Sequence, residues 1–219
     1  MKIAIIAANG QAGQTIAKEA VERGHQVTAI VRSENKSVAQ EVIQKDAFAL
    51  TKEELAGFDV VVNAFGAWTP ETLPGHARLA EHLTTILAGS PTRLLVVGGA
   101  GSLYLDESQT AMLKDTPDFP AEYLPIAEAM GAGLDLYRQA TAINWTYMSP
   151  AADFDAEDSK TGVYTIAGEV FQVNTQGESY ISYADYAVAL VDIAEKGGYQ
   201  QERISVFAQK NKELYICLH

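Results

Sequence analysis

Cysteine is almost absent from this chain of 219 residues, since the only one is Cys217, two positions from the end. One cysteine cannot form an internal disulfide, so we expect a fold held by noncovalent packing in a reducing compartment. Long apolar runs are also missing. The first one, residues 3–8, ends at Asn9-Gly10 and is too short for a membrane span or a signal peptide. We therefore expect a cytoplasmic protein without a targeting or membrane-spanning segment.

Basic residues are scarce, because 16 Lys and Arg face 28 Asp and Glu, which gives a net charge of −12 at pH 7. A surface this acidic repels phosphate backbones and anionic lipids, so we expect neither nucleic acid nor a membrane as partner. The carboxylates are scattered, and the histidines have no ligand spacing, so no metal site is expected. These histidines are His25, His76, His82 and His219. A small molecule remains as the expected partner.

Short apolar runs alternate with amphipathic helical patterns over most of the chain. Strands are expected at residues 3–8, 27–31, 41–45, 59–64, 93–97, 145–148 and 204–208. Helices are expected at residues 11–23, 76–87 and 126–140, with a short one opening at Thr51 and a last one capped by Ser182. Such alternation predicts an α/β fold of the Rossmann type, with a doubly wound parallel sheet covered on both faces.

The last third of the chain has a different character. Residues 150–182 contain shorter strand-like pieces separated by glycines. We expect a single domain over residues 1–219, in which residues 150–182 form a small appended lobe and one wall of a substrate cleft. Residues 210–219 are expected to form a loosely packed end.

A glycine motif follows the first expected strand and opens the first helix, with Ala7 where a first glycine often stands. In this context the motif predicts a dinucleotide site, with the pyrophosphate at the helix N-terminus. The turn is expected to need a residue without Cβ at Gly10, and close packing of the helix on the sheet to need Gly13. A turn without ligand is the alternative. The expected contacts are Asn9, Gly10, Gln11, Ala12 and Gly13.

The second strand ends at Arg32, where dinucleotide sites meet the adenosine ribose. An acidic residue there is typical of NAD, whereas an arginine suits the 2′-phosphate of NADP. Arg32, assisted by Ser33 and Lys36, therefore favours NADP(H) over NAD(H). The alternative is an ordinary solvated arginine at a strand end.

Further candidates follow the other strands, at the edge where open α/β sheets bind ligands. Asp46 is expected at the adenine edge. Ala64, Phe65 and Gly66 are expected near the nicotinamide ribose. Gly98 begins a run of small residues to Ser102 that leaves room for a flat ring. A plain turn is the alternative for each of these segments.

Together these residues resemble the atypical short-chain dehydrogenases with an NAD(P)H-binding domain, the group of the NADH-flavin reductases, which is similar to the biliverdin-IXβ/flavin reductases. The resemblance covers nearly the whole chain. It rests on residues 9–13, 31–33, 45–47, 63–66, 95–104, 145–151 and 181–187. It implies an NAD(P)H-dependent reductase that transfers hydride from the nicotinamide to a flat acceptor such as a flavin or quinone.

The Tyr-x-x-x-Lys pair of carbonyl-reducing short-chain dehydrogenases is absent, because Tyr123 is followed four places on by Ala127. Flavin reductases of the resembled group place a serine near Gly98. Ser102 and Tyr104 are therefore the candidate catalytic residues, with His76 as a further proton donor. Each has an ordinary structural role as its alternative.

Two other functions stay open. One is a non-catalytic NAD(P)-binding redox sensor, similar to regulators of nitrogen-metabolite repression, which share the fold and lack the dyad. The other is an epimerase or dehydratase-like enzyme with a displaced dyad. Turnover of NADPH with flavins or quinones separates the reductase from the sensor.

Overall fold

In the computed structural model, which describes residues 1–210, eight strands form a sheet in the order β3-β2-β1-β4-β5-β6-β10-β8. Neighbouring strands are parallel except β10 and β8, which are antiparallel. The strands are β1 (Lys2–Ile6), β2 (Gln26–Val31), β3 (Glu41–Gln44), β4 (Val60–Asn63), β5 (Arg93–Val97), β6 (Asn144–Ser149), β8 (Thr165–Ala167) and β10 (Glu202–Phe207). This confirms the predicted Rossmann-type α/β fold. The expected loose end falls outside the described residues from position 211 onward.

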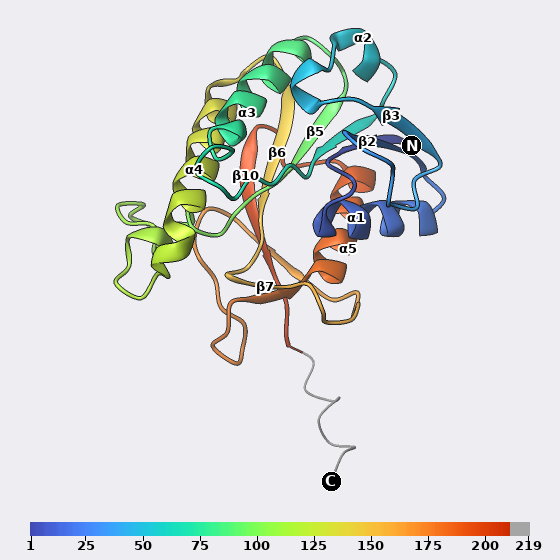
Figure 1. Cartoon of the computed structure of the whole chain (residues 1–219). Helices are drawn as coiled ribbons and strands as arrows, with labels where there is room; N and C mark the ends of the chain where they lie inside the picture. The colour runs from blue at the N-terminus through green and yellow to red at the C-terminus, as the bar shows by residue number, and fades with distance from the viewer. Residues whose placement is uncertain (211–219) are drawn as a thin grey trace.

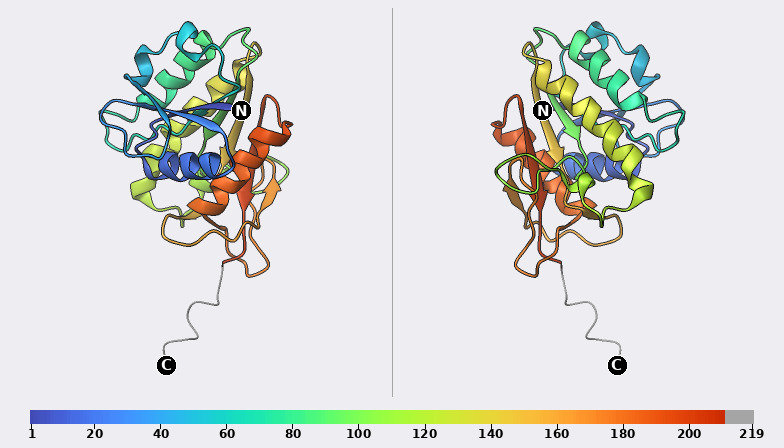
Figure 2. Two further views of the ribbon diagram at one scale, coloured as in Figure 1. Left: turned by 90° about the vertical axis from the view of Figure 1, so that its right-hand side faces the viewer. Right: turned by 90° about the vertical axis from the view of Figure 1, so that its left-hand side faces the viewer.

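Helices cover both faces of the sheet (Figures 1 and 2). α1 (Gln11–Glu22) and α5 (Tyr183–Lys196) pack together on one face, and α3 (Gly75–Ile86) and α4 (Leu124–Gln139) on the other. α2 (Lys52–Leu55) is a single turn that begins with the expected capping box of Thr51 and Glu54. None of the helices in residues 1–210 is long and apolar enough to cross a membrane.

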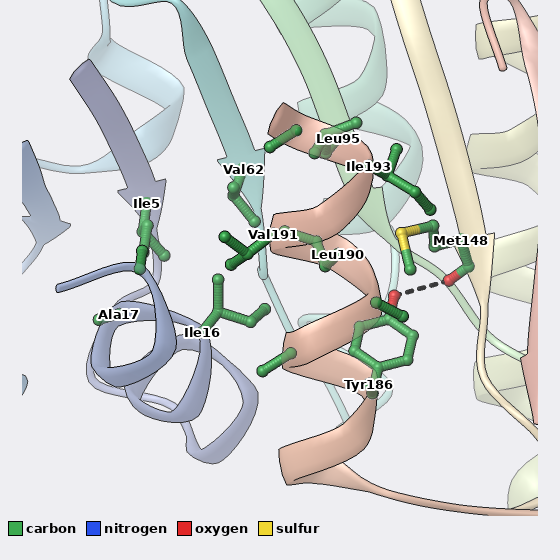
Figure 3. Packing of buried hydrophobic residues seen from close by; sticks show 14 of the residues in the cluster. Ile5, Ile16, Ala17, Val62, Leu95, Met148, Tyr186, Leu190, Val191 and Ile193 are labelled. Atoms are coloured by element: carbon green, nitrogen blue, oxygen red, sulfur yellow. Dashed lines mark hydrogen bonds between the residues drawn. The ribbon is translucent and has the colours of Figure 1, made fainter. Parts of the chain in front are cut away.

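Two apolar cores follow from this layering, because strands buried on both faces carry apolar side chains in both directions. Figure 3 shows the core beneath α1 and α5, where Ile16 and Leu190 meet the side chains of the sheet. The hydroxyl of Tyr186 lies within this core and donates to the carbonyl oxygen of Met148 at 2.8 Å. The sheet is therefore densely packed against α1 and α5.

The register of the parallel strands brings distant segments to one edge. Ile6 of β1 pairs with Ile30 of β2 on one side and with Asn63 of β4 on the other. Asn63 pairs in turn with Val96 of β5. The chain order reverses between β1 and β4, and such a switch point is where open α/β sheets bind ligands, outside the carboxyl ends of their strands.

The segment from 150 to 182 combines two arrangements. β7 (Asp153–Asp155) and β9 (Tyr180–Ser182) form a separate two-stranded parallel sheet. β8, by contrast, joins the edge of the main sheet beside β10. The buried carboxylate of Asp185 accepts hydrogen bonds from the backbone N–H groups of Thr161 and Gly162 and from the Thr161 hydroxyl, at 2.7–2.8 Å. The segment is thus fastened to α5.

Candidate functional site

The turn from β1 into α1 is made by Ala7, whose φ of 58° lies in the left-handed region. Its N–H donates to Ile30 and its carbonyl accepts from Gly10, both at 3.0 Å. A residue with a Cβ in this conformation carries backbone strain, and such strain concentrates at functional sites. The conformation explains why a glycine is common at this position.

Gly10 and Gly13 are small for different reasons. Gly10 has φ −72° and ψ 161°, an extended conformation open to any residue, and a Cβ there would lie 3.4 Å from the Ala7 oxygen. The prediction that the turn itself needs glycine at position 10 was therefore wrong. At Gly13 a Cβ would lie 2.5 Å from the Ala7 oxygen and 2.8 Å from Cα of Ala8, which confirms the close packing of helix on strand.

The N-terminus of α1 offers unpartnered donors beside Gly10. No side chain caps this end, and its first turn has no acidic residue. Among the hydrogen bonds of residues 1–210, none uses the backbone N–H of Gln11, Ala12 or Gly13. Free N–H groups and the positive end of the helix dipole together suit a phosphate group.

The side chain of Asn9 is turned toward the segment after β2 and is bonded there at both ends of its amide. Arg32 begins that segment and is exposed. Within the described part of the chain its guanidinium forms no hydrogen bond or ion pair, not even with Glu34 two residues away. Arg32 is thus available at the end of β2, and its contact with the adenosine ribose stays a prediction.

Asp46 follows β3 and caps a short 3-10 helix (Ala47–Ala49), where its carboxylate accepts from the N–H of Phe48 at 2.9 Å. Its neighbour Lys45 forms an ion pair with Glu54 at 2.8 Å. Asp46 thus shapes the loop after β3, and its contact with an adenine stays a prediction.

The end of β4 is organised by Asn63, which is buried. Its Oδ1 accepts from the N–H of Phe65 and its Nδ2 donates to the hydroxyl of Tyr137, both at 3.1 Å. The ring of Phe65 in turn packs edge-on against His76, with the ring centres 5.4 Å apart. The segment of Ala64, Phe65 and Gly66 is therefore held in place at the switch point.

The glycine-rich loop after β5 rests on α4 and β6. A Cβ on Gly98 would collide with the ring of Tyr147, and a Cβ on Gly101 would lie 2.6 Å from that of Ala127. The N–H of Gly99 donates to the Tyr147 hydroxyl at 3.3 Å. Packing within the chain thus requires small residues here, a cause that the sequence reasoning missed when it assigned them to a flat ligand.

A small cavity of about 20 Å³ lies between the ends of β4 and β5 and helix α4, with room for about one water. Burial raises the pKa of Tyr147 to about 12 and that of Tyr137 further. Burial also lowers the pKa of His76, against a hydrogen bond with the Ala67 carbonyl. Both tyrosines are therefore protonated and His76 is neutral at pH 7. The lining residues are Asn63, Phe65, His76, Val96, Val97, Met130, Gly133, Tyr137 and Tyr147.

The two candidate catalytic residues differ in access. Ser102 is 6% exposed, and both its hydroxyl and its carbonyl accept hydrogen bonds from Arg203, at 3.3 and 3.1 Å. The buried Arg203 is also paired with Glu169. Such burial disfavours contact between Ser102 and a substrate. Tyr104 is half-buried, and its ring lies 5.9 Å from the guanidinium of Arg203.

A buried alanine, Ala127, stands at the position where a Tyr-x-x-x-Lys pair would have its lysine. Tyr123 is 52% exposed just before α4, whereas Ala127, one turn later, is buried against Gly101. Ala127 therefore packs beneath that loop, and no lysine stands one turn after Tyr123. In residues 1–210, no three His, Cys, Asp or Glu side chains gather in a group that could hold a metal ion.

The sequence model of the NAD(P)H-binding family matches residues 7–196. The uncharacterized protein YwnB of Bacillus subtilis is 49% identical over 212 residues, which are 95% of this chain and 99% of YwnB.

Solved structures are similar over the same length. A Streptococcus pneumoniae protein named "a putative NADH-flavin reductase" is 58% identical, with a TM-score of 0.93 over 95% of this chain and 100% of its own. A Bacteroides thetaiotaomicron protein named a "putative epimerase" is 31% identical, with a TM-score of 0.83 over 96% of this chain and 98% of its own.

Proposed function

This chain belongs to the NAD(P)H-binding family, and we propose that it is an oxidoreductase that passes hydride from NAD(P)H to a flat acceptor such as a flavin or quinone. The observation that carries the proposal is the turn between β1 and α1, which we call the phosphate cradle. There the N–H groups of Gln11, Ala12 and Gly13 are free beside Gly10. The name of the Streptococcus pneumoniae relative, 58% identical, supports the acceptor class.

The residues present fit a dinucleotide along the carboxyl edge of the sheet. A Cβ at Gly10 would have the Ala7 oxygen, at 3.4 Å, as its only neighbour within 4 Å, and we infer that the space beside it takes a pyrophosphate. Arg32 lies on the β2 side of the switch point, the side that this proposal assigns to the adenosine. Phe65 and Gly98 lie on the opposite side, at the ends of β4 and β5.

Little acid–base chemistry is required of the chain. A bound nicotinamide supplies the hydride through its own electronics. The residues of the protein bind and orient the reacting rings and exclude water from them. Tyr147 holds the Gly98 loop from below, and its raised pKa keeps it protonated. Tyr104 stays the candidate proton donor, because Ser102 is covered by Arg203.

We further propose NADPH as the preferred donor. A guanidinium forms charge-assisted and often bidentate hydrogen bonds with a phosphate. Arg32 is exposed and unpaired within residues 1–210, and Ser33 and Lys36 lie on the same short segment. No carboxylate stands at position 32 to bind two ribose hydroxyls, as NAD-specific sites require.

Rapid mixing of NADPH with flavins and quinones tests the reductase. Loss of the absorbance of the reduced nicotinamide is the expected result. Tight NADPH binding without turnover across a broad panel of acceptors would instead identify a redox sensor. Turnover of a sugar substrate without net oxidation of the nucleotide would identify an epimerase.

A further inference from the structure

Asn9 joins two segments that lie 25 residues apart in the chain. Its Nδ2 donates to the carbonyl oxygen of Glu34 at 2.8 Å and lies 3.4 Å from the hydroxyl of Ser33. Its Oδ1 accepts from the N–H of Lys36 at 2.7 Å. A flipped amide would set oxygen against the carbonyl and NH₂ against the N–H, so the partners fix its orientation.

The segment that Asn9 holds is itself a closed turn. Oδ1 of Asn35 accepts from the N–H and the hydroxyl of Ser37, at 3.0 and 2.8 Å. These bonds stabilise the conformation of the turn. The hydrogen bonds of Asn9 then fix the position of the turn relative to the loop between β1 and α1. On the other side, the Gln14 side chain donates to the Asn9 carbonyl at 2.8 Å, a contact with the Asn9 backbone that does not involve the Asn9 amide or its partners.

Three groups suited to an anion lie on this held segment. They are the guanidinium of Arg32, the hydroxyl of Ser33 and the ammonium of Lys36, all on exposed residues. The cradle at Gly10 is one residue from Asn9. In a dinucleotide, the pyrophosphate and a phosphate on the adenosine 2′-oxygen are separated by a single ribose. A side chain that bridges the two loops therefore sets the distance between the two anion subsites.

We propose that Asn9 is a positioning residue for the selection of NADPH: it places Arg32, Ser33 and Lys36 around the 2′-phosphate without touching that phosphate itself. This rests on the proposed use of NADPH. It also changes the expected role of Asn9, since both ends of its amide are occupied by the chain and are not directed at the pyrophosphate.

If Asn9 only stabilised the fold, its replacement would change the affinities for NADH and NADPH by the same factor. The discriminating quantity is therefore the ratio of the NADH dissociation constant to the NADPH dissociation constant. We would measure it by calorimetric titration for the wild type, Asn9→Ala, Arg32→Ala and the double variant. Gln14→Ala is the matched control, because it removes a hydrogen bond to Asn9 without releasing the Ser33–Lys36 segment. Thermal unfolding of each variant verifies that it is folded.

The wild type is expected to prefer NADPH, and Asn9→Ala to lower the ratio about fivefold or more, the factor that one neutral hydrogen bond represents. Gln14→Ala should leave the ratio unchanged. If Asn9 acts through Arg32, its replacement should add little in the Arg32→Ala background.

Two results would overturn the proposal. A wild-type preference that survives in a folded Asn9→Ala protein would show that Asn9 positions nothing for the phosphate, while the choice of NADPH would stand. Equal affinities in the wild type would remove the choice of NADPH and the role of Asn9 together, and would leave the hydride-transfer proposal untouched.

Discussion

The backbone N–H of Gly99 donates to the hydroxyl of Tyr147 at 3.3 Å, and the same ring fills the space in which a Cβ on Gly98 would stand. One side chain of β6 thus supports the loop that follows β5. The loop needs small residues at positions 98 and 101, because a Cβ there would collide with Tyr147 and Ala127, respectively. A ligand above the loop would meet a surface whose shape these two side chains determine.

Replacement of Gly98 with alanine is expected to destabilise the protein by about 1–3 kcal/mol, because overpacking forces the Tyr147 ring to move. Gly131→Ala is the matched control. It lies inside α4 with no atom within 4 Å of the added Cβ, and should stabilise by about 0.5–1 kcal/mol. Urea unfolding measures both. Equal stability of the two variants would show that the Tyr147 ring can move aside without a loss of stability.

Gly10 and Gly13 separate ligand binding from packing. Gly13→Ala should lower stability by about 1–3 kcal/mol, since its Cβ would lie 2.5 Å from the Ala7 oxygen. Gly10→Val should fold, with a loss of about 0.5–1 kcal/mol from placing valine at the N-cap of α1, and lose dinucleotide binding, because the added side chain would occupy the phosphate cradle. Unfolding curves and cofactor titrations are the paired measurements. A folded Gly10→Val protein with normal cofactor affinity would refute the cradle.

The layers of the fold could be predicted because they depend on local periodicity. The alternation of apolar runs and amphipathic helices, the capping box at Thr51 and the cap at Ser182 are all short-range patterns that the structure reproduces. The role of Gly13 followed from the same βα unit. The predicted ends of helices and strands differ from the structure by at most two residues, and those of β5 agree with it.

Features that depend on distant partners could not be predicted. Ser102 is covered by Arg203, 101 residues along the chain, and no pattern near either residue announces this pairing. β8 is three residues long and is a strand only because β10 lies beside it. Tyr147 was visible only as part of a strand. Its support of Gly98 arises from the packing of β6 against the loop after β5.

Asp192 connects α5 with α1 and predicts a dependence of stability on pH. Burial alone raises the pKa of its carboxyl, but hydrogen bonds from Lys196, Tyr164 and Arg23 outweigh this and hold the pKa at about 2, below the ordinary 3.8. A depressed pKa stabilises the fold above about pH 4, and this contribution, about 2 kcal/mol, is lost as the pH falls toward 2.

Asp192→Asn should therefore cost about 1–2 kcal/mol at pH 7, and the difference from the wild type should shrink toward pH 2. Asp135→Asn is the control, because the Asp135 carboxylate is 66% exposed and its pair with Arg138 contributes at most about 0.5 kcal/mol. Urea unfolding at several pH values measures both. A pH-independent difference would mean that the Asp192 hydrogen bonds do not require its charge.

Tyr123→Phe should leave turnover within about threefold of the wild type, since an exposed phenol without a lysine one turn away gains no help in proton transfer.

Tyr104→Phe is the informative companion. If the Tyr104 hydroxyl protonates the acceptor, its loss should lower kcat by a factor on the order of 10²–10⁴, the usual contribution of a general acid. Steady-state kinetics with NADPH and the fastest acceptor measure both. A large loss in Tyr123→Phe would require a cation from another part of the chain to complete a dyad, and would favour carbonyl or sugar chemistry. Unchanged rates in both variants would mean that the acceptor takes its proton from water, which suits a flavin or quinone whose reduced form is stable before protonation.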